Sequence, residues 1–216
     1  MRNLFSLPVV VLFLNLACVL AVTPAVGCQS LAISSRTVSV PEEAFSGSRE
    51  AFEKKRNYLS FQLPYEPIKS VFDQLERMTG DRLITRGEAH VTVLTPPELE
   101  AVEKFVSIED VERIALEESI QASDLTPVCL GRGEAILDRR KRERTYFIVV
   151  RSKNLLVIRR RIEALHIERG GERGVFQATK FYPHITVGFT KSDLHESHGV
   201  VKDERSCIFE VSLTRR

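Results

Sequence analysis

Apolar and polar residues follow a pattern that repeats in two halves from residue 57 onward. In the first half, Asn57–Pro64 alternates as a strand does, and the residues after it place apolar side chains at helical spacing as far as Gly80. A second strand, Glu88–Pro96, ends near two prolines, which favour the start of a helix. A capping pattern at Ser107 and Asp110 predicts one more short helix.

The second half begins with two strands, Pro127–Leu137 and Arg144–Val150, joined by a basic turn. Residues 154–171 place apolar side chains on one helical face and end in two glycines. Phe181–Phe189 is strand-like, and Cys207–Leu213 is a closing strand. Each half thus contains a strand, an amphipathic helix, a turn and a histidine-bearing strand, which predicts an α+β fold with two similar lobes.

The N-terminal residues have a different pattern, in which Arg2 precedes an apolar run from Leu7 to Val22 and small residues follow. This is typical of a secretory signal peptide. We assign it to residues 1–27, with cleavage after Ala21 or Gly27, and we expect the protein to be secreted.

Two alternatives to a cleaved signal peptide stay open. One is a single membrane anchor, but the apolar run is interrupted by Asn15 and closed by Pro24, which leaves it short of the roughly 20 residues of a span. The other is a lipoprotein site at Cys28, although Ala25 stands where leucine is usual. We expect no stable membrane association after leader cleavage.

Residues 28–48 are rich in serine and show little apolar periodicity, so we expect a mobile N-terminal arm there. Residues 49–216 then form a single bilobal domain, for which a mature chain of about 190 residues is long enough.

Charge and cysteine content say little about the binding partners of the protein, but they limit the possible disulfides. The formal charge of the whole chain is +2, so overall charge says little about partners. Cys28, Cys129 and Cys207 remain after the leader, an odd number that allows one disulfide and one free thiol. We predict that Cys129 and Cys207, both in expected strands of the second half, form the disulfide. The sequence contains no C-x-x-C motif or Cys/His cluster of the kind that would predict a zinc site.

Two strands carry the same histidine–apolar–threonine motif. His90 and Thr92 belong to one strand, and His184 and Thr186 to the other, with a β-branched apolar residue between them in each case. Side chains two apart in a strand face the same side, so each motif presents an imidazole and a hydroxyl together from a packed support. If the two lobes face each other, all four groups line one cleft.

Paired histidines suit phosphodiester chemistry. A neutral imidazole takes a proton from the attacking water or hydroxyl, and an imidazolium gives one to the leaving oxygen. The threonine hydroxyls donate to the non-bridging oxygens as charge builds there. This scheme needs no metal and no cofactor.

A short motif also arises by chance. His195-Glu196-Ser197 is a third match, and we interpret it as accidental because it lies in a polar stretch. His166 is expected to interact with the dipole at the C-terminus of its helix, and His198 to lie in a loop. The non-functional alternative for His90 and His184 is that both are hydrogen-bonded core histidines with no catalytic role.

With these motifs, the chain resembles the 2H phosphoesterase superfamily of 2′-5′ RNA ligase-like and cyclic phosphodiesterase proteins. The segments "HVTV" and "PHITVGF" carry the resemblance, and the order of elements agrees from about Asn57 to Leu213. It implies a bilobal fold, with two pseudo-symmetric lobes of antiparallel sheet and outer helices around a central cleft. A secretory leader departs from most members, which are intracellular.

The same resemblance implies metal-independent hydrolysis of 2′,3′-cyclic phosphates, on RNA ends or small cyclic nucleotides. His90 and His184 would be the acid–base pair, and Thr92 and Thr186 would hold the phosphate. The alternatives are a secreted RNA-binding or effector module without turnover and, more weakly, an RNA ligase. Retention of both motifs favours the enzyme. A monomer is favoured.

Further substrate contacts are harder to assign. Tyr182 and Tyr146 are candidates to stack on a base, and Lys180 to lie at the mouth of the cleft. The basic stretch 138–144 either contacts an RNA backbone or forms a solvated hairpin tip.

Overall fold

The computed structural model describes residues 37–47, 54–55, 58–137 and 141–215. The predicted leader, its cleavage sites and Cys28 lie outside these residues. No helix within the described ranges is both long enough and apolar enough to cross a membrane.

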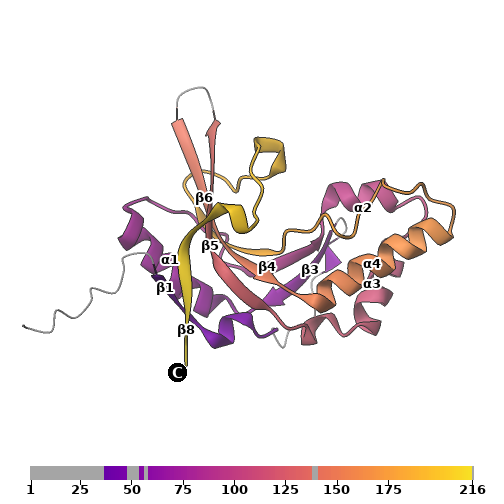
Figure 1. The fold of residues 1–216 in the computed structure, drawn as a ribbon, viewed down its shortest axis with the longest axis horizontal. Coiled ribbons are helices and arrows are strands. Elements are labelled where there is room, and N and C mark those ends of the chain that lie inside the picture. Colours follow the sequence, from indigo (N-terminus) through magenta and orange to yellow (C-terminus); the bar gives the residue numbers. More distant parts are fainter. Residues whose placement is uncertain (1–36, 48–53, 56–57, 138–140, 216) are drawn as a thin grey trace, which may run out of the picture. The chain divides into compact units, whose positions relative to one another are not determined.

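The described strands form one eight-stranded sheet with the order β1-β8-β5-β6-β7-β4-β3-β2 (Figure 1). All neighbouring strands run antiparallel except β1 and β8, which are parallel. The two histidine-bearing strands, β4 and β7, lie side by side within this sheet. The strand bounds are β1 Thr37–Pro41, β2 Lys54–Lys55, β3 Tyr58–Leu63, β4 Ala89–Leu94, β5 Thr126–Leu137, β6 Lys141–Arg151, β7 His184–Phe189 and β8 Cys207–Thr214.

Four α-helices accompany the sheet within the described residues, and local sequence signals explain their ends. Gly80 closes the first in a left-handed conformation (φ 69°), which glycine adopts without strain. Ser107 and Asp110 form the predicted capping box at the start of the third. The bounds are α1 Tyr65–Thr79, α2 Pro96–Val102, α3 Ile108–Glu117 and α4 Lys153–Glu168, with short 3-10 turns η1 Glu42–Phe45, η2 Ile120–Ala122, η3 Glu196–His198 and η4 Glu204–Ser206.

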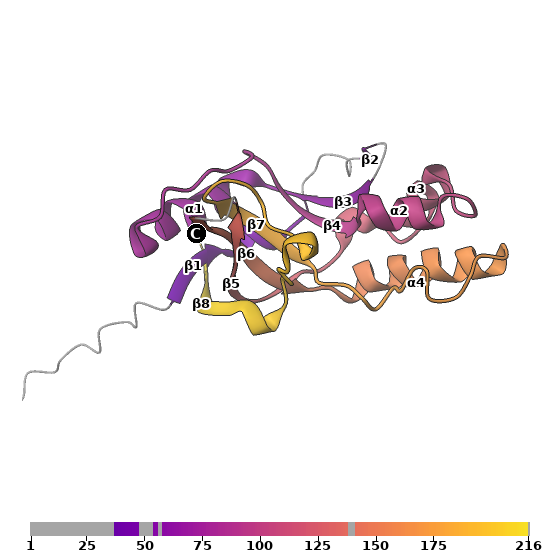
Figure 2. The same ribbon diagram turned by 90° about the horizontal axis from the view of Figure 1, so that it is seen from above.

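Each long helix packs against the histidine strand of the other half: α1 contacts β7, and α4 contacts β4. Figure 2 shows α1 toward one end of the sheet and α2, α3 and α4 toward the other. The close approach of α1 favours glycine at position 188, because a Cβ there would lie 3.0 Å from the Phe72 ring. The apolar residues of β4 and β7 that alternate with the motif residues are buried: Val91, Val93, Ile185 and Val187. The α+β class is confirmed, whereas two-lobed pseudo-symmetry stays a prediction.

The expectation that the folded domain begins near residue 49 is wrong. Within the predicted mobile arm, Thr37–Pro41 forms β1 beside β8, and Val38 and Val40 are fully buried. Its alternating sequence, TVSVP, is too short to stand out beside a serine-rich stretch. Only the presence of an open sheet edge at β8 gives this segment its hydrogen-bond partner.

The predicted disulfide between Cys129 and Cys207 is present and joins β5 to β8, with 5.7 Å between the two Cα atoms. Within the described part of the basic stretch, Arg142 and Arg144 both pair with Glu134, and Arg144 also pairs with Asp81 at 2.6 Å. These contacts favour a hairpin stabilised by ion pairs over an RNA contact at these two arginines.

Candidate active site

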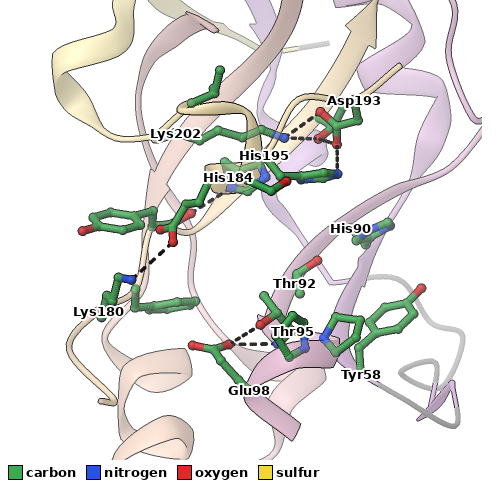
Figure 3. A pocket seen from close by; sticks show the side chains of 18 of the residues that line it. Tyr58, His90, Thr92, Thr95, Glu98, Lys180, His184, Asp193, His195 and Lys202 are labelled. Carbon is green, nitrogen blue, oxygen red and sulfur yellow. Dashed lines mark hydrogen bonds and ion pairs between the residues drawn. The ribbon is translucent and has the colours of Figure 1, made fainter. Parts of the chain in front are cut away.

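A cavity of about 860 Å³ is lined by both histidine motifs. Its size falls within the range of small-molecule sites, roughly 300–1,000 Å³. Figure 3 shows His90 and Thr92 on one side of the cavity, and His184 and His195 on the other. The four predicted motif residues therefore share one space.

The pairing of β4 with β7 explains how the motifs come together. Val91 pairs with Ile185 in antiparallel register, and both side chains are fully buried. The residues on either side of each must then point the other way, toward the cavity. Two segments far apart in sequence thus place their imidazoles and hydroxyls on one face.

His184 is held in a defined tautomer. Its Nδ1 lies 2.8 Å from the carbonyl oxygen of Tyr182, which can only accept, so Nδ1 carries the proton and Nε2 keeps a lone pair. The ring packs edge-on against Phe147. Burial has the largest effect on His184 and the positive charge of Lys202 the next largest, and together they lower its pKa to about 3. His184 is therefore neutral at physiological pH and is suited to accept a proton.

His90 has a different environment. Its Nδ1 lies 3.7 Å from Oε1 of Glu88, which forms an ion pair with the ring when the ring is protonated. The Tyr58 ring lies nearby, with 6.3 Å between the two centroids. This carboxylate can serve as the counter-charge of a protonated ring, so His90 is placed to be the acid of the pair.

A buried carboxylate that sequence reasoning missed lies beneath the β7 motif. Asp193 accepts hydrogen bonds from Lys202 Nζ at 2.7 Å, from the Thr145 hydroxyl at 2.7 Å and from the Thr186 hydroxyl at 3.2 Å. The side chains of Asp193 and Lys202 are each only 4% exposed. The two residues lie on an irregular segment after β7, where no local pattern marks them.

The ion pair between Asp193 and Lys202 is charged despite its burial. Burial alone would raise the pKa of Asp193, but the charge of Lys202 and its hydrogen bond outweigh this and lower it to about 2. Burial lowers the pKa of Lys202, and Asp193 counteracts that effect. Each charge is therefore kept in place by the other.

The two threonines are not equivalent. Thr186 gives its single hydroxyl proton to Asp193, and it accepts a longer hydrogen bond, of 3.4 Å, from Lys202. Thr92 makes no such side-chain hydrogen bond within the described part of the chain, and it also lines the cavity. Thr92 is therefore free to donate to a ligand, whereas on the β7 side the Lys202 ammonium is the donor with capacity to spare.

His195, interpreted from the sequence as an accidental match, lies in a polar loop that also lines the cavity. Its Nε2 lies 3.9 Å from Asp193, and its side chain is 54% exposed. Burial, with the nearby charges of Lys202 and Arg86, lowers the pKa of His195, and Asp193 opposes this shift. His198, by contrast, is exposed in η3.

Of the other residues predicted to contact substrate, two line the cavity and one does not. Tyr182 and Lys180 line the cavity, and Lys180 pairs with Glu196 at 3.3 Å. The expectation for Tyr146 is wrong, because its ring is fully buried and its hydroxyl donates to Asp81 at 2.6 Å. Tyr146 faces inward from β6 and does not line the cavity.

A buried arginine supports the other end of the cavity. Arg159 of α4 is 1% exposed and donates to Glu98 at 2.7 Å and to the Val93 carbonyl oxygen, also at 2.7 Å. It lies over the rings of Phe176 and Phe181. Arg159 also donates to the carbonyl oxygens of Gln177, Ala178 and Lys180. These bonds join β4, α2 and the loop before β7 into one wall.

No group of three or more His, Cys, Asp or Glu side chains in the described ranges has the arrangement of a metal site. Asp193 instead has a lysine and two threonines as its neighbours.

Comparison with known families agrees with this arrangement. The family model described as "Swiss Army Knife, 2H phosphoesterase domain" matches residues 57–195, which include both histidine motifs, Asp193 and His195. The chain belongs to the 2H phosphoesterase superfamily. Membership supports a phosphodiesterase-type function. No curated protein and no solved structure matched the chain.

Proposed function

We propose that this protein hydrolyses 2′,3′-cyclic phosphates, on RNA ends or on cyclic nucleotides, by acid–base catalysis between His184 and His90. The observation that carries the proposal is the pairing of β4 with β7, which brings both motifs to one cavity. The fixed tautomer of His184 supports its role as the base. The carboxylate beside His90 supports the role of that histidine as the acid.

In this mechanism, His184 Nε2 removes a proton from water as the water oxygen forms a bond to phosphorus. The bond from phosphorus to one ring oxygen breaks, and His90 donates its proton to that oxygen. Thr92 and Lys202 donate to the non-bridging oxygens, where negative charge increases. Proton exchange with solvent then restores both imidazoles.

The test is turnover of adenosine 2′,3′-cyclic phosphate and of a short RNA with a cyclic phosphate end, by the purified chain. We expect hydrolysis to a single monoester, and loss of most of the rate in His90→Ala and in His184→Ala. Tight binding of these ligands without turnover would contradict the proposal and support the binding module. Activity lost in EDTA and restored by a divalent ion would contradict the metal-independent mechanism.

A further inference from the structure

Arg86 lies at the cavity wall on the loop between α1 and β4, and backbone contacts hold that loop in place. Ile84 forms two hydrogen bonds with Phe189 of β7, of 2.7 and 3.0 Å. The Thr85 hydroxyl accepts from the Tyr65 hydroxyl and from the amide of Gly87, which turns the chain with a φ of 71°. Arg86 is therefore presented from a fixed turn.

The other strong cations at the cavity wall already have carboxylate partners. Lys202 pairs with Asp193, Lys180 with Glu196, and Arg159 with Glu98. Within the described part of the chain, Arg86 has no carboxylate at ion-pair distance. An exposed guanidinium without a partner, at the wall of a cavity, is available for an anion.

The Arg86 loop lies beside the end of β7, because Ile84 bonds to Phe189 there, and the segment that follows β7 carries His195 and Lys202 to the wall of the same cavity. At the opposite end, near α2 and the loop before β7, Pro96, Val175 and Phe176 line the cavity beside the ion-paired Arg159 and Glu98. Among the described residues, the positive charge at the cavity wall that no carboxylate offsets therefore lies at Arg86.

We propose that Arg86, assisted by His195, binds a second phosphate of the substrate, distinct from the phosphate that is hydrolysed. Arginine suits this role because its planar fork matches two phosphate oxygens at once. The preferred substrate is then an oligonucleotide end or a nucleotide with an additional phosphate, in preference to a cyclic nucleoside monophosphate. This inference rests on the proposed function.

A binding experiment tests the subsite without turnover. The affinity of the full chain for adenosine 3′,5′-bisphosphate is compared with its affinity for adenosine 3′-monophosphate by calorimetry. We expect the bisphosphate to bind about tenfold more tightly, as for one charge-assisted contact. Arg86→Gln should reduce this ratio to near one. Arg82→Gln is the matched control, since Arg82 is exposed on the same loop and does not line the cavity.

A kinetic experiment separates this inference from the proposed function. Adenosine 2′,3′-cyclic phosphate is compared with its 5′-phosphorylated form, in the wild type and both variants. A preference for the 5′-phosphorylated form that only Arg86→Gln abolishes supports the subsite. Turnover without preference overturns the subsite and leaves the proposed function in place. Bisphosphate selectivity without any turnover supports the subsite and overturns the proposed function. An equal loss of selectivity in Arg82→Gln overturns the specific role of Arg86.

Discussion

At the scale of single residues, the hydroxyls of Thr92 and Thr186 differ in what they can still donate. Thr186 gives its proton to a buried carboxylate, whereas Thr92 has no competing side-chain acceptor in the described structure. Thr186, which already bonds to Asp193, contributes to folding, whereas Thr92 is the hydroxyl that donates to the phosphate in the proposed mechanism. The same three-residue motif thus places its threonine in two different environments within one site.

Replacing each threonine by valine should separate these purposes. Thr92→Val should lower kcat/KM by roughly 10²- to 10³-fold, as for an oxyanion donor, with little change in stability. Thr186→Val should lower the free energy of unfolding by about 1–3 kcal/mol, because Asp193 loses a donor, and should reduce kcat/KM less. Steady-state kinetics and urea unfolding check both variants, and the opposite ranking would contradict the asymmetry.

The two histidines predict the pH dependence of the reaction. In the proposed mechanism His184 acts only when neutral, and its pKa of about 3 keeps it neutral until the pH falls close to that value. The acid limb of kcat/KM should therefore lie well below 6.5, the ordinary pKa of histidine. The alkaline limb reflects loss of the proton from the acid. Both apparent values belong to the pair.

A pH profile of kcat/KM, limited to conditions where circular dichroism shows folded protein, checks this prediction. His90→Ala and His184→Ala should each lose roughly 10²- to 10⁴-fold in rate. An acid limb near pH 6.5 would show that His184 is not the low-pKa base.

At the scale of elements, a buried ion pair joins two parts of the segment between β7 and β8, and its carboxylate also bonds to the sheet. Asp193 and Lys202 are its two partners, and the Thr145 hydroxyl of β6 joins the network. This pair orders a stretch that otherwise contains only short 3-10 turns. It also keeps His195 and Lys202 at the cavity wall.

Breaking the pair from one side should be strongly destabilising. Asp193→Asn leaves the Lys202 ammonium buried without a counter-charge, and we expect a loss of about 3–5 kcal/mol in the free energy of unfolding. The double variant Asp193→Leu with Lys202→Met should recover much of that loss. Urea unfolding measures both variants.

The matched control is Asp73→Asn, which breaks the exposed Lys69–Asp73 pair on α1 and should leave stability nearly unchanged. A loss as small in Asp193→Asn as in this control would contradict a structural role for the buried pair.

At the scale of the whole molecule, the Cys129–Cys207 disulfide bears on where the protein functions. Disulfides persist in oxidising compartments, so this bond supports the proposal that the N-terminal segment directs export. It spans 78 residues of sequence and joins the strand β8 to the sheet. Removing it should therefore affect the whole domain.

Secretion predicts a defined processed chain. We expect mass spectrometry of exported protein to find an N-terminus between Val22 and Cys28, since small residues follow the apolar run there. Exported material that begins at Met1 would contradict cleavage.

The disulfide can be tested separately. Non-reducing peptide mapping should find Cys129 linked to Cys207, and the double alanine variant should lose about 2–5 kcal/mol in the free energy of unfolding. Free thiols at both positions, or unchanged stability in the variant, would show that the bond has no structural role.

The sequence by itself determined the elements and the two histidine motifs. Strand alternation and helical spacing depend on neighbouring residues, so β3, α1, β4, α4 and β7 were predictable from local patterns. The direction of His90 and His184 also followed locally, because residues two apart in a strand face the same side. The pairing of Cys129 with Cys207 followed from their places in strands of the second half.

Only the tertiary structure decided which partners these residues meet. The pairing of β1 with β8, the burial of Tyr146, the Asp193–Lys202 pair and the place of His195 at the cavity all depend on contacts between distant segments. No local pattern encodes a partner that packing brings close. Burial then sets the protonation of His184, because desolvation and the charge of Lys202 act through space and not along the chain.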